Sequence, residues 1–481
     1  MAGSGVAPNR LAVRPMLLER SIGRLRQRVV PIRWSHVFGV ISMAAMVVLL
    51  VTGIYLTFFY EPSGPHVTYD GDYAPLRGVE MSPAYESTLR LSSEVRGGLL
   101  VRQTHHWAAL VLPASLMLQL FSIFLAGAFR RPRRGMWLLL FATFTLALVG
   151  GWSGYALPDD SLSGTGLRIM HGMVMGIPVI GSTLAFLLFG GEFPGRILEV
   201  LYPLHVFVVP LLLVGVVALR LRLAFRRGPM REPPARGEGA DGTRATSLRA
   251  TAMRYAGMFV IFSAVLVGMG ATLTISPIWR YGPANAANAS NGSQPDWYLG
   301  FLDGALRLVP PGWEVVLWDR TWPLALLVPM AVVSAFMMVV ASYPFIESRL
   351  SRDRDEHHVL ERARDNPTRT GVGAAGAVFY AVLLFSGGVD VIGTQLHLSF
   401  ESLIYVFRAG IVLGPVLAFV VARGVCLDLQ RRERQEQTVG LETGQVMRAL
   451  DGGYAELHAP LPSRGARPTP RGRAASEDDA A

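Results

Sequence analysis

The sequence predicts an all-α integral membrane protein with eight transmembrane helices, and three observations carry that prediction. Hydrophobic residues make up 51% of the 481 residues, whereas charged residues make up only 17%. The charged residues gather in short blocks between eight apolar runs, most of them long enough to cross a hydrocarbon core of about 30 Å. Arginines are concentrated in alternate loops, which is the bias that orients membrane proteins. This pattern excludes a soluble globular fold.

The apolar runs divide the chain into two halves. Spans are expected at 34–59, 105–129, 136–157, 201–223, 252–275, 323–343, 371–386 and 403–421. The connector 158–181 is too polar and glycine-rich to be a further span. Residues 226–250 are rich in Arg, Gly and Pro, which predicts a cytoplasmic linker between a half at 34–225 and a half at 251–462.

The ends of the chain are polar. Residues 1–33 are basic and contain no apolar core, so no cleavable signal peptide is expected there. Residues 463–481 have the composition of a disordered tail. Eight spans return both ends to one side of the membrane, and the basic blocks at 10–33, 130–134, 220–254, 349–369 and 423–434 all fall on that side. The sequence therefore predicts a protein of the cell membrane with both termini cytoplasmic, and the net charge of +10 needs no nucleic-acid partner.

Two histidines at the starts of spans are the first functional candidates. His105 and His205 lie at the same predicted depth, near the outer face. A histidine within a membrane helix is costly unless it is paired or used, and a neutral imidazole is a common axial ligand of haem iron. We expect the two helices to hold a haem between His105 and His205; the alternative is a pair of buried, hydrogen-bonded helix-end residues.

Small residues at the same depth favour the haem hypothesis. Gly53, Gly151 and Gly154 would give a macrocycle bare backbone to lie against, although small residues also serve ordinary helix packing. Arg102, one turn before His105, is expected either to face a haem propionate or to anchor the helix at the interface.

Motifs along nearly the whole chain, from about 34 to 462, resemble cytochrome b of the respiratory quinol–cytochrome c reductase (bc1-type) complexes in its actinobacterial form. They are Thr-Gly-Ile-Tyr-Leu at 52–56, Arg-Gln-Thr-His-His-Trp at 102–107, Gly-Tyr-Ala-Leu-Pro-Asp-Asp at 154–160, Leu-His at 204–205, Gln-Pro-Asp-Trp-Tyr at 294–298, Tyr-Pro-Phe-Ile-Glu at 343–347 and Gly-Tyr-Ala-Glu-Leu-His at 453–458. The resemblance implies a four-helix haem-binding bundle followed by a four-helix half that completes an outer quinol-oxidation pocket.

Within the resemblance, Pro295, Asp296, Trp297 and Tyr298 look like the signature of that quinol pocket, with Asp where many members have Glu. A carboxylate at 296 is expected to accept a quinol proton, and Tyr298 to hydrogen-bond the quinol ring. Taken alone, the stretch also fits an interfacial loop with a Trp/Tyr belt.

The chain departs from the family at the position of a second, inner haem. The inner ligand on the second span would lie 14 residues after His105, which is Gln119. On the fourth span it would lie 14 or 15 residues after His205, which is Leu219 or Arg220. The inner glycine of the third span is replaced by Leu140, and only Gly39 remains.

We therefore expect one b haem, or two if another residue rescues the inner site. Neither His36 nor Met117 is well placed to do so. Arg220 has no lone pair for iron, and it is expected to reach the interface or to pair with Gln119 in a collapsed, haem-free cavity. A divergent paralogue without the inner haem would not run a complete Q cycle alone.

Three functional readings stay open. The first is a catalytic subunit that oxidises quinol, with menaquinol suggested by the actinobacterial likeness, in a complex that the family implies to be dimeric. The single cysteine, Cys426, excludes a Cys-ligated cluster, so a Rieske iron–sulfur subunit and a cytochrome c subunit are expected as partners. The others are a single-haem membrane redox carrier and a non-catalytic structural paralogue.

Overall fold

The computed structural model describes residues 29–31, 34–231, 245–285, 287, 294–448 and 452–459. Eight helices in these ranges are long and apolar enough to span a membrane, which confirms the predicted fold class. Residues 1–28, residues 232–244 of the predicted linker and the predicted tail at 463–481 lie outside the described residues.

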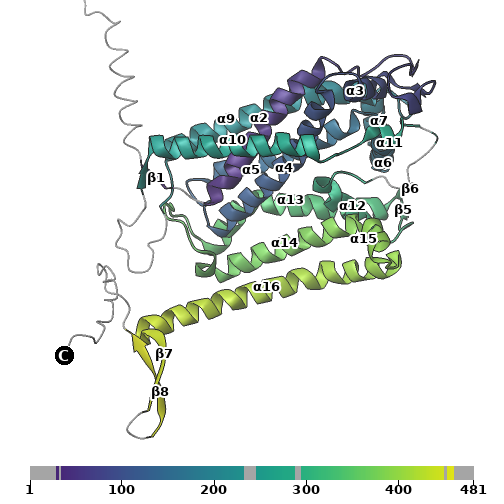
Figure 1. Ribbon diagram of the computed structural model, residues 1–481. Coiled ribbons are helices and arrows are strands. Elements are labelled where there is room, and N and C mark those ends of the chain that lie inside the picture. The colour runs from purple at the N-terminus through teal and green to yellow at the C-terminus, as the bar shows by residue number, and fades with distance from the viewer. Residues whose placement is uncertain are drawn as a thin grey trace, which may run out of the picture.

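The long helices run side by side (Figure 1). They are α2 (Trp34–Thr57), α4 (Gly98–Leu125), α5 (Arg134–Ala156), α9 (Val209–Arg227) with α8 (Ile197–Pro203) before it, α10 (Leu248–Thr272), α13 (Leu324–Ser351), α14 (Pro367–Gly387) and α16 (Phe400–Val439). Shorter helices lie in the connections: α3 (Pro83–Ser93), α6 (Ser161–Met175), α7 (Gly181–Phe189), α11 (Ile278–Tyr281), α12 (Gly300–Leu308) and α15 (Val389–Leu396). Single 3₁₀ turns occur at Ala74–Leu76, Trp297–Leu299 and Ala363–Asp365.

In the described part of the chain, strands form four small antiparallel pairs. They are β1 (Val29–Pro31) with β4 (Ala245–Ser247), β2 (Val67–Thr68) with β3 (Glu80–Met81), β5 (Val315–Leu317) with β6 (Arg320–Trp322), and β7 (Leu441–Arg448) with β8 (Tyr454–Ala459). The last pair is a hairpin that projects from the end of α16 (Figure 1).

Two predicted boundaries differ from the structure. Helix α4 begins at Gly98, two turns before His105, because the buried Arg102 is accommodated inside the helix and does not end it. Helix α16 continues to Val439, well beyond the predicted end at 421. Its last turns are rich in Arg and Glu, residues with good helix propensity, so the helix continues after the apolar run has ended.

The fourth span is not one regular helix. Between α8 and α9 the chain makes one π-helical turn at Leu204–Val208, directly after Pro203. A π turn holds one more residue than the α-helical turn it replaces. Residues on α9 are therefore rotated relative to the register that a regular helix from His205 would give.

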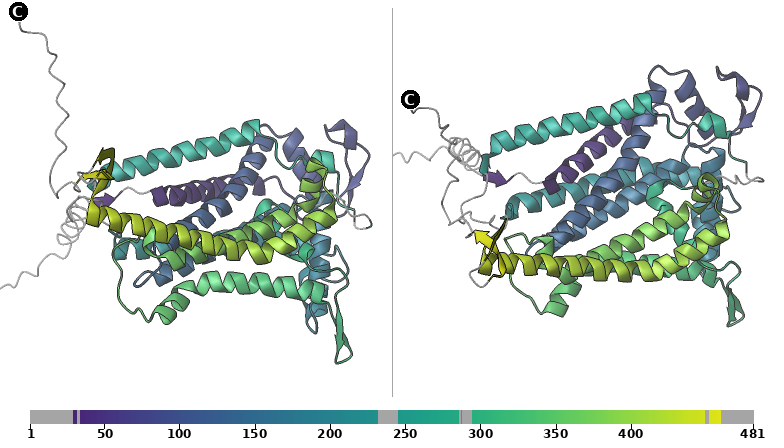
Figure 2. Two further views of the ribbon diagram at one scale, coloured as in Figure 1. Left: turned by 90° about the horizontal axis from the view of Figure 1, so that it is seen from below. Right: turned by 60° about the horizontal axis from the view of Figure 1, so that its bottom comes forward.

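The core lies between the helices. Helix α4 packs against α2, α5 and α10, α9 packs against α5, and α14 packs against α16 and α4. The right-hand view in Figure 2 shows α10 alongside the first helices and α16 along the opposite edge. The buried core includes Leu112, Leu116, Phe144, Phe301 and Leu383. Outward-facing residues such as Leu211 (74% exposed) and Val412 (65% exposed) are also apolar, as contact with lipid requires.

A buried ion cluster joins distant parts of the chain at the end of the helices away from the two histidines. The side chain of Arg369 on α14 is 1% exposed and pairs with Glu347 and Glu361. Arg130, in the turn after α4, pairs with the same two carboxylates. Because α13 carries Glu347, the cluster ties the α4–α5 turn to both α13 and α14.

Candidate functional site

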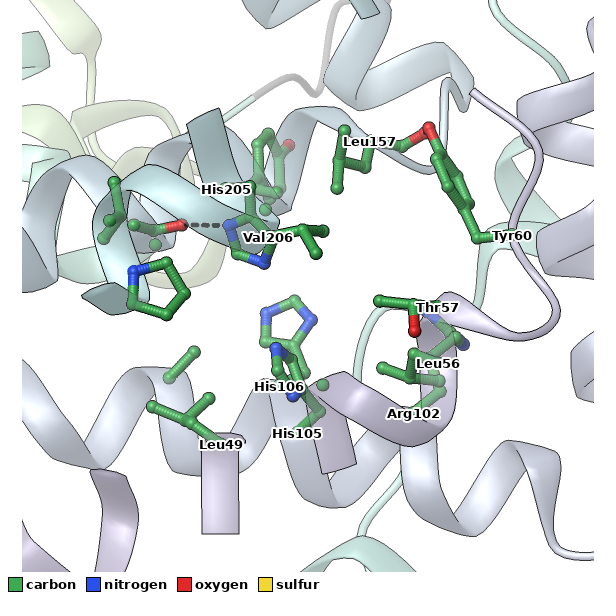
Figure 3. A pocket seen from close by; sticks show the side chains of 18 of the residues that line it. Leu49, Leu56, Thr57, Tyr60, Arg102, His105, His106, Leu157, His205 and Val206 are labelled. Carbon is green, nitrogen blue, oxygen red and sulfur yellow. Dashed lines mark hydrogen bonds between the residues drawn. The ribbon is translucent and has the colours of Figure 1, made fainter. Parts of the chain in front are cut away.

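His105 on α4 and His205 on the π turn face each other across a cavity (Figure 3). Their ring centroids are 6.2 Å apart, and the ring planes are inclined by 67°. Two metal–nitrogen bonds of about 2 Å each would fit within this separation once the radii of both rings are included. The structure therefore brings together the two residues that the sequence proposes as a pair.

The hydrogen bonds of each imidazole leave one nitrogen available. Nδ1 of His205 lies 3.0 Å from the carbonyl oxygen of Gly150, which can only accept, so Nδ1 carries the proton. Nδ1 of His105 lies 2.8 Å from the hydroxyl of Thr52, and that hydroxyl donates to the carbonyl of Val48. In both neutral rings the lone pair is then on Nε2, the nitrogen that an iron would need.

Two of the three predicted glycines lie directly under the histidines. A Cβ atom at Gly53 would lie 3.3 Å from Cε1 of His105, and one at Gly154 would lie 2.4 Å from Cε1 of His205. Gly151 has a different neighbour: a Cβ there would lie 2.4 Å from the hydroxyl oxygen of Tyr298. Gly151 lines the same cavity, but its bare backbone makes room for the tyrosine.

The cavity between the histidines, which we call the outer cavity, has a volume of about 730 Å³. His105, His205, Gly53, Gly154 and Arg102 all line it. The size and the two available nitrogens fit a b haem.

Arg102 supplies a cation at the wall of the outer cavity. Its side chain donates to the carbonyl of Ser276 over 2.7 Å, while its buried Nε has no hydrogen-bond partner among the described residues. Because Arg102 is only 8% exposed, it does not act as an anchor reaching to the interface. An orphaned guanidinium nitrogen in this position suits an anionic group such as a propionate.

The Pro295–Tyr298 stretch lies at the same cavity. Asp296 and His106 line the cavity, and Nε2 of His106 is 3.2 Å from Oδ1 of Asp296. The hydroxyl of Tyr298 donates to Oδ2 of Asp296 over 2.9 Å. Burial, together with the nearby carboxylate of Asp296, raises the pKa of Tyr298 well above its ordinary value, so the hydroxyl stays protonated.

Pro295 and Trp297 are the two neighbours of Asp296 in the chain. Trp297 is partly buried and packs against the hydrophobic core, which makes it more than a residue of an interfacial belt. Pro295 is partly buried directly before Asp296. The four residues of the predicted pocket therefore lie together, and Asp296 alone among them lines the outer cavity.

Sequence reasoning assigned no role to Thr52, Gly150 or His106. Thr52 stands directly before Gly53 in a motif singled out for its glycine, and its hydroxyl is one turn from a backbone acceptor. Gly150 contributes only a carbonyl oxygen, which a sequence does not reveal. His106 follows His105, and its carboxylate partner is 190 residues away.

At the inner position the pattern of the outer site recurs without its ligands. A Cβ atom at Gly39 would lie 2.9 Å from Nε2 of Gln119, so Gln119 lies over Gly39 as His105 lies over Gly53. Leu219 is 46% exposed, whereas Arg220 lines a second cavity beside Gln119. The π turn explains why the spacing of 15, and not 14, selects the inward-facing residue.

The expected collapse of this region is wrong. The second cavity, which we call the inner cavity, has a volume of about 1090 Å³. The surrounding helices stay apart, and the side chains of Gln119 and Arg220 are too small to fill the space between them. Leu140 is fully buried in the hydrophobic core and is not among the lining residues, so it does not wall the cavity off.

The remaining inner candidates differ in their surroundings. His36 on α2 lines the inner cavity, and its Nδ1 lies 2.6 Å from the hydroxyl of Tyr255. Met117 packs against the hydrophobic core, as expected for a core methionine. Arg220 does not reach the interface freely, because its Nε is buried at the inner cavity. The described residues around this cavity thus offer no facing pair of ligands for a second haem.

Comparisons with known proteins identify the family and the fold of the chain. Residues 110–283 match the family described as Cytochrome b(N-terminal)/b6/petB. The chain is 39% identical over 436 residues to the cytochrome bc1 complex cytochrome b subunit of Streptomyces coelicolor, covering 90% of this chain and 80% of the relative. It is 42% identical over 443 residues to that of Mycobacterium leprae, covering 92% and 80%. A chain of a hyperthermophilic respiratory Complex III has the same fold, with a TM-score of 0.63 at 18% identity, covering 86% of this chain and 99% of that one.

Proposed function

The chain belongs to the cytochrome b subunits of cytochrome bc1 complexes, and from this we propose that it oxidises a quinol at the outer cavity and holds one b haem between His105 and His205. One observation carries the proposal. Two imidazoles face each other over bare glycine backbone, each with Nδ1 hydrogen-bonded, and both line the same cavity as Asp296. A haem held there supplies a one-electron acceptor next to the quinol site.

In this proposal Asp296 is the general base. Its carboxylate takes the proton of a quinol hydroxyl, and its hydrogen bond from Tyr298 fixes the carboxylate in the cavity. His106 then accepts the proton from Asp296 in the tautomer that keeps its N–H on Nδ1 and its lone pair on Nε2, the atom that lies 3.2 Å from Oδ1 of Asp296. The ring of His106 thereby frees Asp296 for the second proton of the quinol.

The inner cavity does not fit a second haem. Gln119 offers a weak amide ligand and Arg220 offers none, so the axial pair is missing. We therefore propose that the chain, alone, does not complete a Q cycle. This feature also favours a second candidate function, a single-haem membrane carrier that exchanges electrons on one face only.

A Rieske iron–sulfur subunit and a cytochrome c subunit would take electrons onward, because one cysteine cannot hold a Cys-ligated cluster. We further propose menaquinol as the substrate, a homodimeric complex, and a cell-membrane location with both termini cytoplasmic.

A haem count with a redox titration tests the proposal. The purified protein should give one b haem per chain in a pyridine haemochrome assay, with a single midpoint potential. A menaquinol analogue should reduce that haem in the wild type and should reduce it far more slowly in Asp296→Asn. Two haems per chain, or unchanged reduction in the variant, would contradict it.

A further inference from the structure

The inner cavity has an unusual charge balance. Among the described residues, four arginines line it, Arg133, Arg220, Arg226 and Arg227, and no Asp or Glu does. A guanidinium remains charged at every accessible pH, and a cation inside a membrane protein is costly unless an anion or strong acceptors face it.

Buried polar atoms at this cavity lack partners. Nε of Arg220, Nη1 of Arg227 and Oε1 of Gln119 have no hydrogen-bond partner among the described residues. Gln119 is 8% exposed, so water at the protein surface does not satisfy it. The two arginine N–H groups carry a desolvation cost that a bound anion would remove, whereas Oε1 of Gln119 is an acceptor and would need a donor such as a hydroxyl.

The remaining wall of the inner cavity is apolar. Met43, Leu116, Leu213 and Phe259 line it on α2, α4, α9 and α10. The cavity reaches the outside of the helices at Phe225, which is 66% exposed. A ligand matched to these walls has a negatively charged head and an apolar body.

We propose that the inner cavity binds an anionic amphiphile, whose phosphate or carboxylate head contacts Arg220 and Arg227 and whose hydrocarbon chain lies on the apolar wall. The inference rests on the proposed absence of an inner haem, since a porphyrin would take the same space. Basic pockets between membrane helices are a known way of holding acidic lipid head groups.

Native mass spectrometry of the full-length, delipidated protein tests this proposal. Three probes are titrated separately: phosphatidylglycerol, zwitterionic phosphatidylcholine with the same chains, and oleate. Tight binding of phosphatidylglycerol alone supports a phospholipid as the source of the anion, and tight binding of oleate supports a free carboxylate. Equal affinity for phosphatidylcholine and for both anionic probes would overturn the proposal.

Two variants each remove one positive charge from α9, one at the cavity and one on an exposed face. Arg220→Gln should weaken the anionic probe about tenfold or more, because a charge-assisted hydrogen bond is lost. Arg222→Gln is the matched control, since Arg222 is exposed and does not line the cavity, and it should bind as the wild type does. Arg227→Gln provides a second test if Arg220→Gln does not fold.

The haem count of the same samples separates two kinds of failure. Two haems per chain would defeat the proposed function and this inference together. One haem per chain, with Arg220→Gln and Arg227→Gln both binding the anionic probes as the wild type does, would defeat this inference alone.

Discussion

The hydroxyl of Thr52 lies 2.8 Å from Nδ1 of His105, and because this hydroxyl donates to the backbone of its own helix, its oxygen accepts a hydrogen bond from the imidazole N–H. This hydrogen bond leaves Nε2 of His105 available for a metal, and it makes Nε2 a stronger electron-pair donor.

Thr52→Val should therefore keep the haem but raise its midpoint potential, on the order of tens of millivolts, because a less basic ligand favours reduced iron. A redox titration measures the shift. His105→Ala is the companion variant, and it should remove the bis-histidine spectrum altogether. A wild-type spectrum in His105→Ala would show that the ligand is another residue.

Gly154→Ala should displace His205 and reduce haem content, since the added Cβ would lie 2.4 Å from the ring. Gly53→Ala should have a milder effect at 3.3 Å. Gly268→Ala on α10 is the control, because a Cβ there meets nothing within 4 Å. The measurement is haem absorbance per protein, and equal loss in all three variants would indicate a general folding defect.

Asp296→Asn should slow quinol oxidation about a hundredfold or more, because the amide keeps the size of the carboxylate but cannot take a proton. His106→Gln should lower the rate less, as it removes the onward acceptor only. Stopped-flow reduction of the haem by a quinol measures both rates. The idea of a relay fails if His106→Gln reacts at the wild-type rate.

The pH dependence of the rate of quinol oxidation tests the role of Tyr298. The pKa of Tyr298 is raised, so its hydroxyl stays protonated between about pH 5 and pH 9 and contributes no titration there. Tyr298→Phe should therefore lower the rate, by removing the hydrogen bond to Asp296, without removing a limb of the pH profile in this range. A Tyr298→Phe profile with a missing limb would contradict the assignment.

Arg369→Met should destabilise the protein by about 3–5 kcal/mol, the usual effect of breaking a buried ion pair, because Glu347 and Glu361 lose a partner. Arg431→Met is the control, since the pair that Arg431 forms with Asp428 is largely exposed. Thermal unfolding followed by size-exclusion chromatography compares the two. Similar melting temperatures for both variants would mean that the cluster adds little stability.

The sequence predicted the helices well because an apolar run of sufficient length has few alternatives in a membrane. It placed His105 and His205 at one depth from the loop charges, and the structure brings the two rings within 6.2 Å of each other. It missed contacts made by backbone groups, such as the carbonyl of Gly150 beneath His205. It also predicted a collapsed inner region, because residue types alone do not show how far apart neighbouring helices stand.

The extra residue in the π turn at Leu204–Val208 has a consequence for reading relatives of this chain. Each residue turns an α-helix by about 100°, so a regular α-helix over the same residues would place Leu219 inward and turn Arg220 away from the cavity. If the second ligand position in a relative is sought 14 residues after the first, the residue aligned with Leu219 is examined in place of the one aligned with Arg220. A haem ligand at the inward position would then be overlooked, and the number of haems would be given as one too few.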